Sequence, residues 1–376
     1  MNWTASTDPF LRRLIWITIA IAAILVVWHA LSWTDRALVR RSVALRAVTP
    51  RGDLAEDERA TIELFDRSRD AVVFITTSEQ IFDFRRRNIF TIPRGTGTGF
   101  IWDTDGHIIT NYHVVEGTSE ARVRLTDGKE YKARLVGTSQ MHDLAVLKIS
   151  GGTKLHPLPL GTSRDLKVGQ KVFAIGNPFG LDWSLTTGIV SALDRSLKGD
   201  SNGAVEHLIQ TDAAINPGDS GGPLLDSGGR LIGVTTAIYS PSGASAGVGF
   251  AVPVDTVNRV VPQLISKGKY VSPSLGFRTD RVLNDIVTER LGIKGVLVLE
   301  VVPGSPAAAE GFRSAKLMAD GTFIPGDIVT EINGKPVESV QELLSRLDDF
   351  KAGETVTITL LRNHNKITRQ LPLRAE

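Results

Sequence analysis

The chain has 376 residues, with 43 Lys and Arg against 41 Asp and Glu, and it contains no cysteine. Its length predicts two or three domains. A formal charge of +2 argues against a nucleic-acid-binding protein, because binding needs a concentrated basic surface. The lack of cysteine excludes disulfides, thiol catalysis and cysteine-ligated metals. The 36 glycines recur as turn signals, which indicates a β-rich globular protein.

After a short tail (residues 1–13), residues 14–33 form an apolar segment. Its core, LIWITIAIAAILVVWHAL from Leu14 to Leu31, has no formal charge and is long enough to cross a bilayer as a helix. Tryptophans, which favour the membrane interface, lie near its ends: Trp16, Trp28 and Trp33. A cleaved signal peptide is the alternative, but its apolar core is usually only about 7–15 residues long. We therefore expect a transmembrane anchor.

The basic residues on either side of this segment make its orientation ambiguous. Two arginines and Asp8 precede the segment, whereas four arginines follow it: Arg36, Arg40, Arg41 and Arg46. Because Lys and Arg concentrate on the cytoplasmic side, this count places the bulk of the protein inside the cell. That placement conflicts with the location expected below, and the orientation stays open.

A charged connector (residues 34–70) leads to a domain over residues 71–266 that consists of short apolar runs between turns. Residues 121–125 and 131–135 alternate in polarity around Asp127-Gly128, which predicts a hairpin. Further strands are expected at 99–102, 144–149, 172–175, 231–236 and 248–252. Because no long helical pattern interrupts them, a β-barrel arrangement is favoured over a parallel sheet.

A helix that carries Val257, Val260, Val261, Leu264 and Ile265 on one face marks the end of this domain. Asp255 is its expected cap, and Gly268 follows its end. Residues 272–376 predict a small α+β domain with strands at 296–301, 328–332 and 355–361. One helix follows Ser339, which has capping-box spacing to Glu342. A unit of this size is usually a binding module.

Three residue types suited to nucleophilic catalysis occur in apolar or glycine-rich surroundings. Ser220 lies in INPGDSGGPL, where glycines permit a special backbone pose and leave main-chain N–H groups free to stabilise negative charge. A serine needs a base, and the base needs an orienting group. His113 ends an apolar run and Asp143 begins one, where an unpaired charge would be costly.

Each of these residues also has a structural interpretation. Alone, His113 is more typical of a satisfied core histidine, and Asp143 is equally typical of a strand cap. His142 is expected to point away from Asp143 in an extended segment. Asp219 is expected to be structural, and Asp212 is a weaker candidate for the acid. The chain order His113, Asp143, Ser220 is nevertheless one in which Ser-His-Asp sites occur.

The segments TNYHVV, HDLAVL and TDAAINPGDSGGPL together resemble the HtrA/Deg family of trypsin-like serine proteases. The resemblance extends from about residue 59 to the C-terminus, and the last third resembles a single PDZ domain. It implies an all-β dominated fold with a chymotrypsin-like double β-barrel, preceded here by the anchor. It further implies His113 as general base, Asp143 as its orienting acid and Ser220 as nucleophile, with the backbone N–H groups of Gly218 and Ser220 as the oxyanion hole.

The same resemblance implies two binding regions. Ile215, Ala237 and Ile238 would line an apolar substrate pocket for small aliphatic side chains. In the PDZ domain, the carboxylate-binding loop that captures a peptide C-terminus would comprise Ser274, Leu275, Gly276 and Phe277. No cofactor and no metal ion are expected. A homotrimer is implied, formed through the barrel domain.

The single PDZ domain and the anchor favour the membrane-tethered regulatory branch of this family. The resulting expectation is a serine endopeptidase anchored in a bacterial inner membrane and facing the periplasm. It would cleave unfolded or partly unfolded proteins, with peptide binding at the PDZ domain regulating its activity. The alternative is a peptide-binding scaffold or chaperone in which the triad never assembles.

Overall fold

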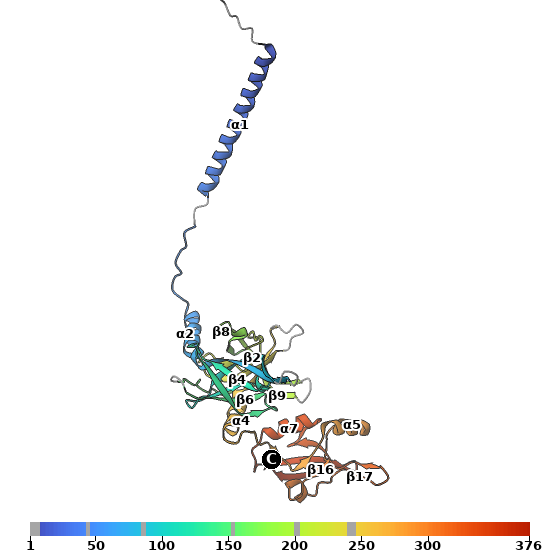
Figure 1. The fold of residues 1–376 in the computed structure, drawn as a ribbon. Helices are drawn as coiled ribbons and strands as arrows, with labels where there is room; N and C mark the ends of the chain where they lie inside the picture. The colour runs from blue at the N-terminus through green and yellow to red at the C-terminus, as the bar shows by residue number, and fades with distance from the viewer. Residues whose placement is uncertain (1–7, 43–45, 84–87, 152–154, 199–203, 239–245) are drawn as a thin grey trace, which may run out of the picture. The chain divides into compact units, whose positions relative to one another are not determined.

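The structure of the chain is a computed structural model that describes residues 8–42, 46–83, 88–151, 155–198, 204–238 and 246–376. The chain divides into two compact units, Met1–Ala55 and Glu56–Glu376. The second unit contains the barrels and the C-terminal domain, which Figure 1 shows in light blue through green to red.

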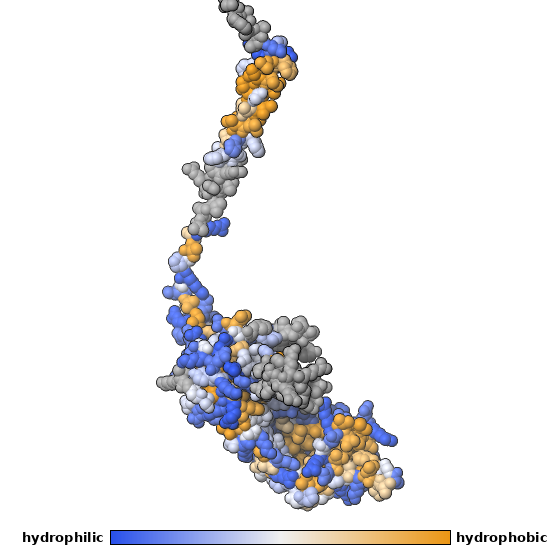
Figure 2. Space-filling model, viewed as in Figure 1, coloured by the Kyte–Doolittle hydropathy of each residue, from blue (hydrophilic) through white to orange (hydrophobic). Residues whose placement is uncertain are grey.

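In its described residues the first unit contains one helix, α1 (Pro9–Ser42). Asp8 starts it, because its Oδ1 accepts a hydrogen bond from the Phe10 amide at 3.0 Å. The stretch Pro9–Thr34 is long and apolar enough to cross a membrane, a property that a signal sequence shares. Apolar side chains cover this stretch in Figure 2. The apolar helix is therefore longer than the predicted segment at 14–33.

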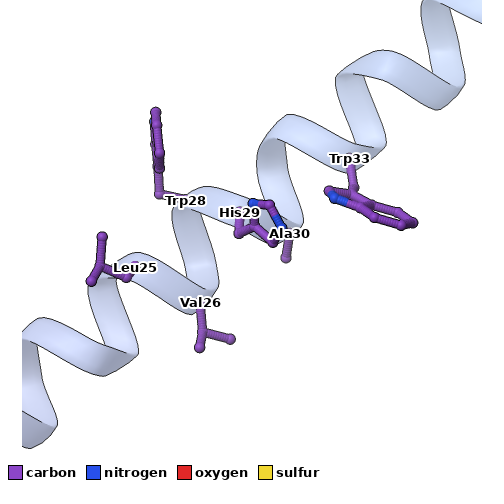
Figure 3. A pocket seen from close by; sticks show the side chains of 6 residues that line it. All are labelled: Leu25, Val26, Trp28, His29, Ala30 and Trp33. Carbon is purple, nitrogen blue, oxygen red and sulfur yellow. The ribbon is translucent and has the colours of Figure 1, made fainter.

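An open hollow lies against α1, which Figure 3 shows from close by. It is lined by six residues of this helix alone: Leu25, Val26, Trp28, His29, Ala30 and Trp33. The rings of His29 and Trp33 meet edge to face, with centroids 6.1 Å apart. Trp28 and Val26 point to opposite sides in Figure 3, so the lining side chains do not enclose a cavity.

The first barrel follows α2 (Glu56–Ser68) and contains the expected hairpin at Asp127-Gly128. Its antiparallel strands close in the order β1-β2-β3-β6-β5-β4. They are β1 (Val72–Asp83), β2 (Asn88–Ile101), β3 (His107–Thr110), β4 (Glu120–Arg124), β5 (Glu130–Ser139) and β6 (Leu144–Ile149). A short helix, α3 (Tyr112–Val115), follows β3. Branched apolar side chains such as Val73, Ile75 and Val123 fill the interior without exposed surface.

The second barrel closes in the order β10-β11-β12-β9-β8-β7. Its strands are β7 (Lys171–Gly176), β8 (Ser184–Lys198), β9 (Ala204–Thr211), β10 (Pro223–Asp226), β11 (Leu231–Ile238) and β12 (Gly249–Pro253). Two closed six-stranded barrels confirm the expected double β-barrel fold. Closure leaves no sheet edge open, so the loops between strands remain available to carry the site.

Helix α4 (Val254–Lys267) packs its buried valines against β5, β6, β11 and β12. It ends as expected at Gly268, whose φ of 74° lets its N–H bond to the Leu264 carbonyl. The expected cap, Asp255, was wrong, because the helix begins one residue earlier, after Pro253. The Asp255 carboxylate instead accepts hydrogen bonds from the backbone and hydroxyl of Ser163, both at 2.7 Å.

The C-terminal domain surrounds a small antiparallel sheet with the path β15-β19-β21-β22, to which β20 pairs through β19. These strands are β15 (Val296–Leu297), β19 (Ile328–Ile332), β20 (Lys335–Pro336), β21 (Thr355–Arg362) and β22 (Asn365–Pro372). Shorter pairs are β13 (Pro273–Ser274) with β23 (Arg374–Ala375), β14 (Phe277–Arg278) with β16 (Glu300–Val301), and β17 (Lys316–Leu317) with β18 (Phe323–Ile324). The predicted strand at 296–301 is therefore two strands, which pair with different partners.

Three helices complete this domain: α5 (Arg281–Leu291), α6 (Pro306–Ala309) and α7 (Val340–Asp348). Helix α7 begins as predicted, because the Ser339 hydroxyl accepts a hydrogen bond from the Glu342 amide at 3.1 Å. The Glu342 carboxylate, however, accepts from the Glu338 amide, one residue before the cap. Leu343 and Leu347 of α7 pack into the domain core with Leu275.

Candidate active site

His113 and Asp143 lie together at the edge of the first barrel. Helix α3 carries His113, and the turn between β5 and β6 carries Asp143. The imidazole Nδ1 lies 2.8 Å from Asp143 Oδ2 and 3.0 Å from Oδ1. The backbone N–H of His113 also donates to Oδ1 at 3.0 Å. One carboxylate thus fixes both the ring and the main chain of the histidine, and the Nδ1 contact leaves Nε2 free for another partner.

The turn that carries Asp143 is tight and conformationally unusual. Asp143 has a φ of 51°, a left-handed conformation that is uncommon outside glycine. Its N–H donates to the Gln140 carbonyl at 3.1 Å, and the Asn111 side chain donates to its carbonyl at 2.9 Å. The Asp143 side chain is 11% exposed, whereas that of His113 is 45% exposed. Asp143 is therefore shielded and His113 is accessible.

Ser220 comes from the second barrel, in the segment between β9 and β10. Its hydroxyl donates to the Thr236 carbonyl at 2.9 Å, and no hydrogen bond joins it to His113 in the described part of the chain. Its own carbonyl accepts from the Thr98 amide of the first barrel at 2.9 Å. The serine is thus fixed at the junction of the barrels, with its hydroxyl turned toward Thr236.

Thr236, near the end of β11, connects Asp143 to Ser220. Its hydroxyl donates to Asp143 Oδ2, while its carbonyl accepts the Ser220 hydroxyl. Sequence reasoning missed Thr236 and also Asn111. Asn111 lies inside the TNYHVV motif, two residues before His113, which was a usable signal, and it is fully buried. Thr236 stands in an ordinary strand pattern, so nothing in the sequence marks it.

Glycines around Ser220 allow the backbone to approach its neighbours closely. Gly218 and Gly221 have φ values of 100° and 87°, which side chains rarely permit. A methyl group at Gly221 would lie 2.2 Å from the Thr98 carbonyl oxygen, and one at Gly222 would lie 2.5 Å from the Ile175 carbonyl oxygen. The turn therefore excludes larger residues at these positions.

Some backbone N–H groups of this turn donate hydrogen bonds within the protein, and others do not. The N–H groups of Asp219, Gly221 and Gly222 donate to backbone carbonyls at 2.8–3.0 Å. Within the described residues, the N–H groups of Gly218 and Ser220 have no acceptor. The two amides predicted to form an oxyanion hole are thus the two that remain available to a ligand.

Asp219, next to the nucleophile candidate, is a buried carboxylate with few donors. Its Oδ2 accepts from the Asn216 amide at 2.9 Å, whereas its Oδ1 has no partner in the described structure. Burial raises the pKa of Asp219 to about 6, although the Asn216 hydrogen bond opposes this rise. Asp219 therefore supports the turn and does not contact the histidine.

The predicted pocket residues are only partly described. Ile215 is 1% exposed and belongs to the apolar interior of the second barrel. Gly249 makes room for it, because a methyl group there would lie 2.8 Å from Ile215 Cγ1. The backbone of Ala237 and Ile238 lies in β11, but their side chains lie outside the described residues. A pocket role for these three residues stays a prediction.

The predicted carboxylate loop, Ser274 to Phe277, connects β13 to β14. Gly276 has a φ of 82°, and its N–H lies 3.0 Å from the Ser274 hydroxyl oxygen. Arg374, paired with Ser274 between β13 and β23, lies beside this loop. Its buried Nε has no partner among the described residues, and a methyl group at Gly276 would lie 3.4 Å from it. A guanidinium thus adjoins the loop expected to receive a carboxylate.

The other candidate residues have different partners. The Asp212 carboxylate accepts from the Ile189 amide at 2.7 Å and so fixes β8. His142 lies in a turn and not in an extended segment, and its Nε2 lies 2.8 Å from Asp348 in the C-terminal domain. The structure therefore brings together His113 and Asp143, and it links Ser220 to them through Thr236.

The chain matches two domain families. Residues 97–234 match the trypsin-like peptidase domain, and residues 273–373 match the PDZ domain. The solved structure of the HtrA-type protease AlgW with a decapeptide is similar in fold, with a TM-score of 0.63 and 31% sequence identity. The similarity covers 84% of this chain and 98% of that one.

Comparison with the sequences of known proteins places the chain among the same proteases. Protease Do-like 1, chloroplastic, from Arabidopsis thaliana is 48% identical over 330 residues, covering 87% of this chain and 74% of the relative. Periplasmic pH-dependent serine endoprotease DegQ from Escherichia coli (strain K12) is 39% identical over 282 residues, covering 74% of this chain and 59% of the relative. The chain therefore belongs to the HtrA/Deg family of trypsin-like serine endoproteases that carry a PDZ domain.

Proposed function

We propose that this protease cleaves unfolded or partly unfolded proteins through an acyl-enzyme formed on Ser220, with His113 as general base and Asp143 as its orienting acid. The observation that carries the proposal is the Asp143–His113 pair at 2.8 Å, which Thr236 ties to Ser220. A carboxylate on Nδ1 leaves Nε2 as the proton acceptor.

In this mechanism the Ser220 hydroxyl first rotates from the Thr236 carbonyl toward His113 Nε2. The imidazole takes the hydroxyl proton as Oγ attacks the carbonyl carbon of the scissile peptide bond. The N–H groups of Gly218 and Ser220 donate to the oxyanion that forms, and Asp143 stabilises the imidazolium. His113 then protonates the departing amine, which leaves the acyl group on Ser220. In the second half, His113 takes a proton from water as the water oxygen attacks the acyl carbonyl carbon, and it returns that proton to Ser220 Oγ as the acyl product leaves.

The PDZ domain binds peptide C-termini at the loop Ser274–Phe277, adding the peptide to the edge of β14. The decapeptide in the AlgW structure supports a peptide ligand for this family. Arg374, beside the loop, would add a charge-assisted hydrogen bond to the terminal carboxylate. Binding there regulates proteolysis if the peptide has different affinities for active and inactive arrangements of the site.

The proposed location is a bacterial inner membrane, with one spanning helix and the protease domain in the periplasm. The apolar stretch Pro9–Thr34 and the DegP-like relatives named as periplasmic support it. Envelope protein quality control or regulated proteolysis follows from that location. Trimerisation through the barrel domain rests on the family resemblance alone.

The test is Ser220→Ala in the full-length protein in detergent, assayed on an unfolded substrate such as casein. Proteolysis should fall by at least about 1,000-fold, because the nucleophile is lost. Binding of a C-terminal peptide should persist, and wild-type activity should survive EDTA. Unchanged turnover by the variant would refute the assignment of Ser220. Absence of turnover in the wild-type protein, with peptide binding intact, would favour a scaffold or chaperone.

A further inference from the structure

His142, directly before Asp143, is a buried side chain that links the two domains. His142 is 6% exposed, which is low for a histidine in a turn. The ring Nδ1 lies 2.7 Å from the Ser139 hydroxyl, at the start of the same turn. The ring Nε2 lies 2.8 Å from Asp348 Oδ2, in the last residue of α7. The ring therefore spans from the turn of the acid to a PDZ helix.

Asp348 is held rigidly by groups from the protease side. Arg259 of α4 lies 2.5 Å from its Oδ2 and also donates to its backbone carbonyl. The Tyr270 hydroxyl donates to Oδ1 at 2.6 Å, and the Tyr270 ring meets the His142 ring edge to face at 4.8 Å. His142 thus contacts a fixed acceptor and not a mobile surface carboxylate.

The charge state of Asp348 decides which group donates the hydrogen bond between Asp348 and His142. Burial raises the pKa of Asp348, but the hydrogen bond and charge of His142, the charge of Arg259 and the hydrogen bond of Tyr270 outweigh it. Together they hold the pKa at about 2. The carboxylate is therefore ionised throughout the neutral range, and His142 Nε2 is the donor.

We propose that His142 is a positioning residue for the reaction: anchored on Asp348 of the PDZ helix α7, it holds the β5–β6 turn so that Asp143 meets His113. The proposal rests on the catalytic role proposed above for Asp143. It assigns the PDZ domain a direct part in the geometry of the triad.

The shape of the turn explains why an anchor matters. Four residues connect β5 to β6, and the last of them, Asp143, adopts a left-handed conformation that is strained for a residue with a side chain. Such a conformation persists only where its surroundings enforce it. The Ser139–His142–Asp348 contacts tie this turn to helix α7. Without them the turn can relax and move the Asp143 carboxylate away from Nδ1.

Helix α7 also contacts the predicted peptide site. It packs near β13, which opens the carboxylate loop, and its Leu343 and Leu347 share a core with Leu275 of that loop. A peptide that shifts α7 would therefore shift Asp348 and, through His142, the turn of Asp143. The anchor provides a short physical route between the two sites.

The experiment measures kcat and KM for a peptide substrate in the full-length protein. His142→Leu should lower kcat by about 10- to 100-fold, because small misplacements of a catalytic group have effects of this size. KM should stay within about twofold, since the substrate pocket is untouched. His142→Gln, which retains a donor for Asp348, should restore kcat to within about threefold of wild type.

The matched control is Ser345→Ala on the same helix. Ser345 contacts His207 at 2.8 Å, so its loss loosens a different contact of α7 with the barrels but leaves His142 in place. Its kcat should remain within about twofold of wild type. Asp348→Ala should lower kcat at least as much as His142→Leu, because it removes the contact with His142 and also those with Arg259 and Tyr270. The double variant should be no worse than Asp348→Ala alone, because the His142 contact is already lost in that variant.

Each variant is first checked for cooperative thermal unfolding. If His142→Leu does not fold, Asp348→Ala and His142→Gln decide the matter, because one removes and one retains the contact. Wild-type or raised kcat in a folded His142→Leu or Asp348→Ala variant would overturn the proposal. An active Ser220→Ala variant would instead overturn the proposed function, so the two failures are distinguishable.

Discussion

Asp143 and Asp219 are two buried carboxylates whose surroundings differ in the number of hydrogen-bond donors. Asp143 accepts from the His113 backbone and ring and from the Thr236 hydroxyl. Asp219 accepts from the Asn216 amide, and its second oxygen has no partner in the described structure. Donors offset the cost of burying a negative charge, and their scarcity raises a carboxyl pKa. The two carboxylates therefore differ in what they contact: Asp143 holds the His113 ring, and Asp219 supports a turn.

The raised pKa of Asp219 predicts a pH-dependent loss of stability. The folded protein holds this proton up to about pH 6, whereas the unfolded chain releases it near 3.8. The stabilising contribution is therefore full below about pH 3.8 and is lost as the pH rises through 6. The Asp219→Asn variant has no carboxyl group at this position, so it cannot lose stability in this way. Between pH 4 and 7, the free energy of unfolding of wild type should fall by roughly 2 kcal/mol relative to the variant.

Urea denaturation at several pH values measures this difference. Ser220→Ala serves as the control, because it alters the neighbouring residue and leaves the carboxyl in place. Its pH dependence should match that of wild type. Parallel curves for wild type and Asp219→Asn over this range would show that Asp219 is ionised without cost and would contradict the prediction.

At the scale of elements, the sequence predicts those strands and helix ends that have a local physical cause. Alternating polarity and Asp127-Gly128 predicted the β4–β5 hairpin, and Gly268 predicted the end of α4. Helix α5 was missed because its pattern is inverted: Val282 and Ile286 are exposed, while Asn284 and Thr288 are buried. Asn284 accepts a hydrogen bond from the Leu297 amide at 2.8 Å, so a polar contact fixes the inner face.

The site residues also divide into those with a local signal in the sequence and those placed by contacts with distant segments. Glycines and three motif residues could be identified because their types are required by the chemistry. Thr236 and the partner of His142 could not, because both depend on contacts between segments far apart in the sequence. His142 and Asp348 are 206 positions apart, and no periodicity or capping rule connects them.

The carboxylate loop between β13 and β14 gives a prediction about peptide binding. Arg374→Met should weaken binding of a decapeptide with a free, apolar C-terminal residue by about 10-fold, because a charge-assisted hydrogen bond is lost. The same peptide with an amidated C-terminus should bind wild type and variant equally. Fluorescence anisotropy measures both.

Arg369→Met is the matched control for charge. Arg369 lies on β22 and contacts Glu310 at 3.8 Å, so its removal changes the net charge by the same amount as Arg374→Met without touching the loop. It should bind the free-acid peptide like wild type. An equal loss in both variants would attribute the effect to overall charge, and no loss in Arg374→Met would exclude Arg374 from the site.

At the scale of the whole molecule, two units have different relations to solvent. The unit Glu56–Glu376 buries its apolar side chains inside two barrels and a PDZ core. The apolar stretch Pro9–Thr34 has none of its residues buried. A bare apolar helix of this length is costly in water, since roughly 25 cal/mol is lost for each Å² of exposed apolar surface. A lipid environment removes that cost.

The orientation of this helix is the point at which charge and family membership disagree. Four arginines follow the apolar run and two precede it, which favours a cytoplasmic protease domain. The relatives named as periplasmic favour the opposite side. Long domains are translocated largely regardless of charge, and only residues close to the span count in the rule. We therefore expect the protease domain to be exported, despite the arginines.

Two reporters fused separately after Arg40 measure the orientation directly. Alkaline phosphatase, which needs an oxidising compartment, should be active, and a fluorescent protein that folds only in the cytosol should stay dark. Replacing Arg36, Arg40, Arg41 and Arg46 by Gln should increase the phosphatase signal, because fewer positive charges then oppose export. A bright cytosolic reporter with inactive phosphatase would contradict the periplasmic location. The protease would then face cytosolic substrates, with its triad and PDZ contacts unchanged.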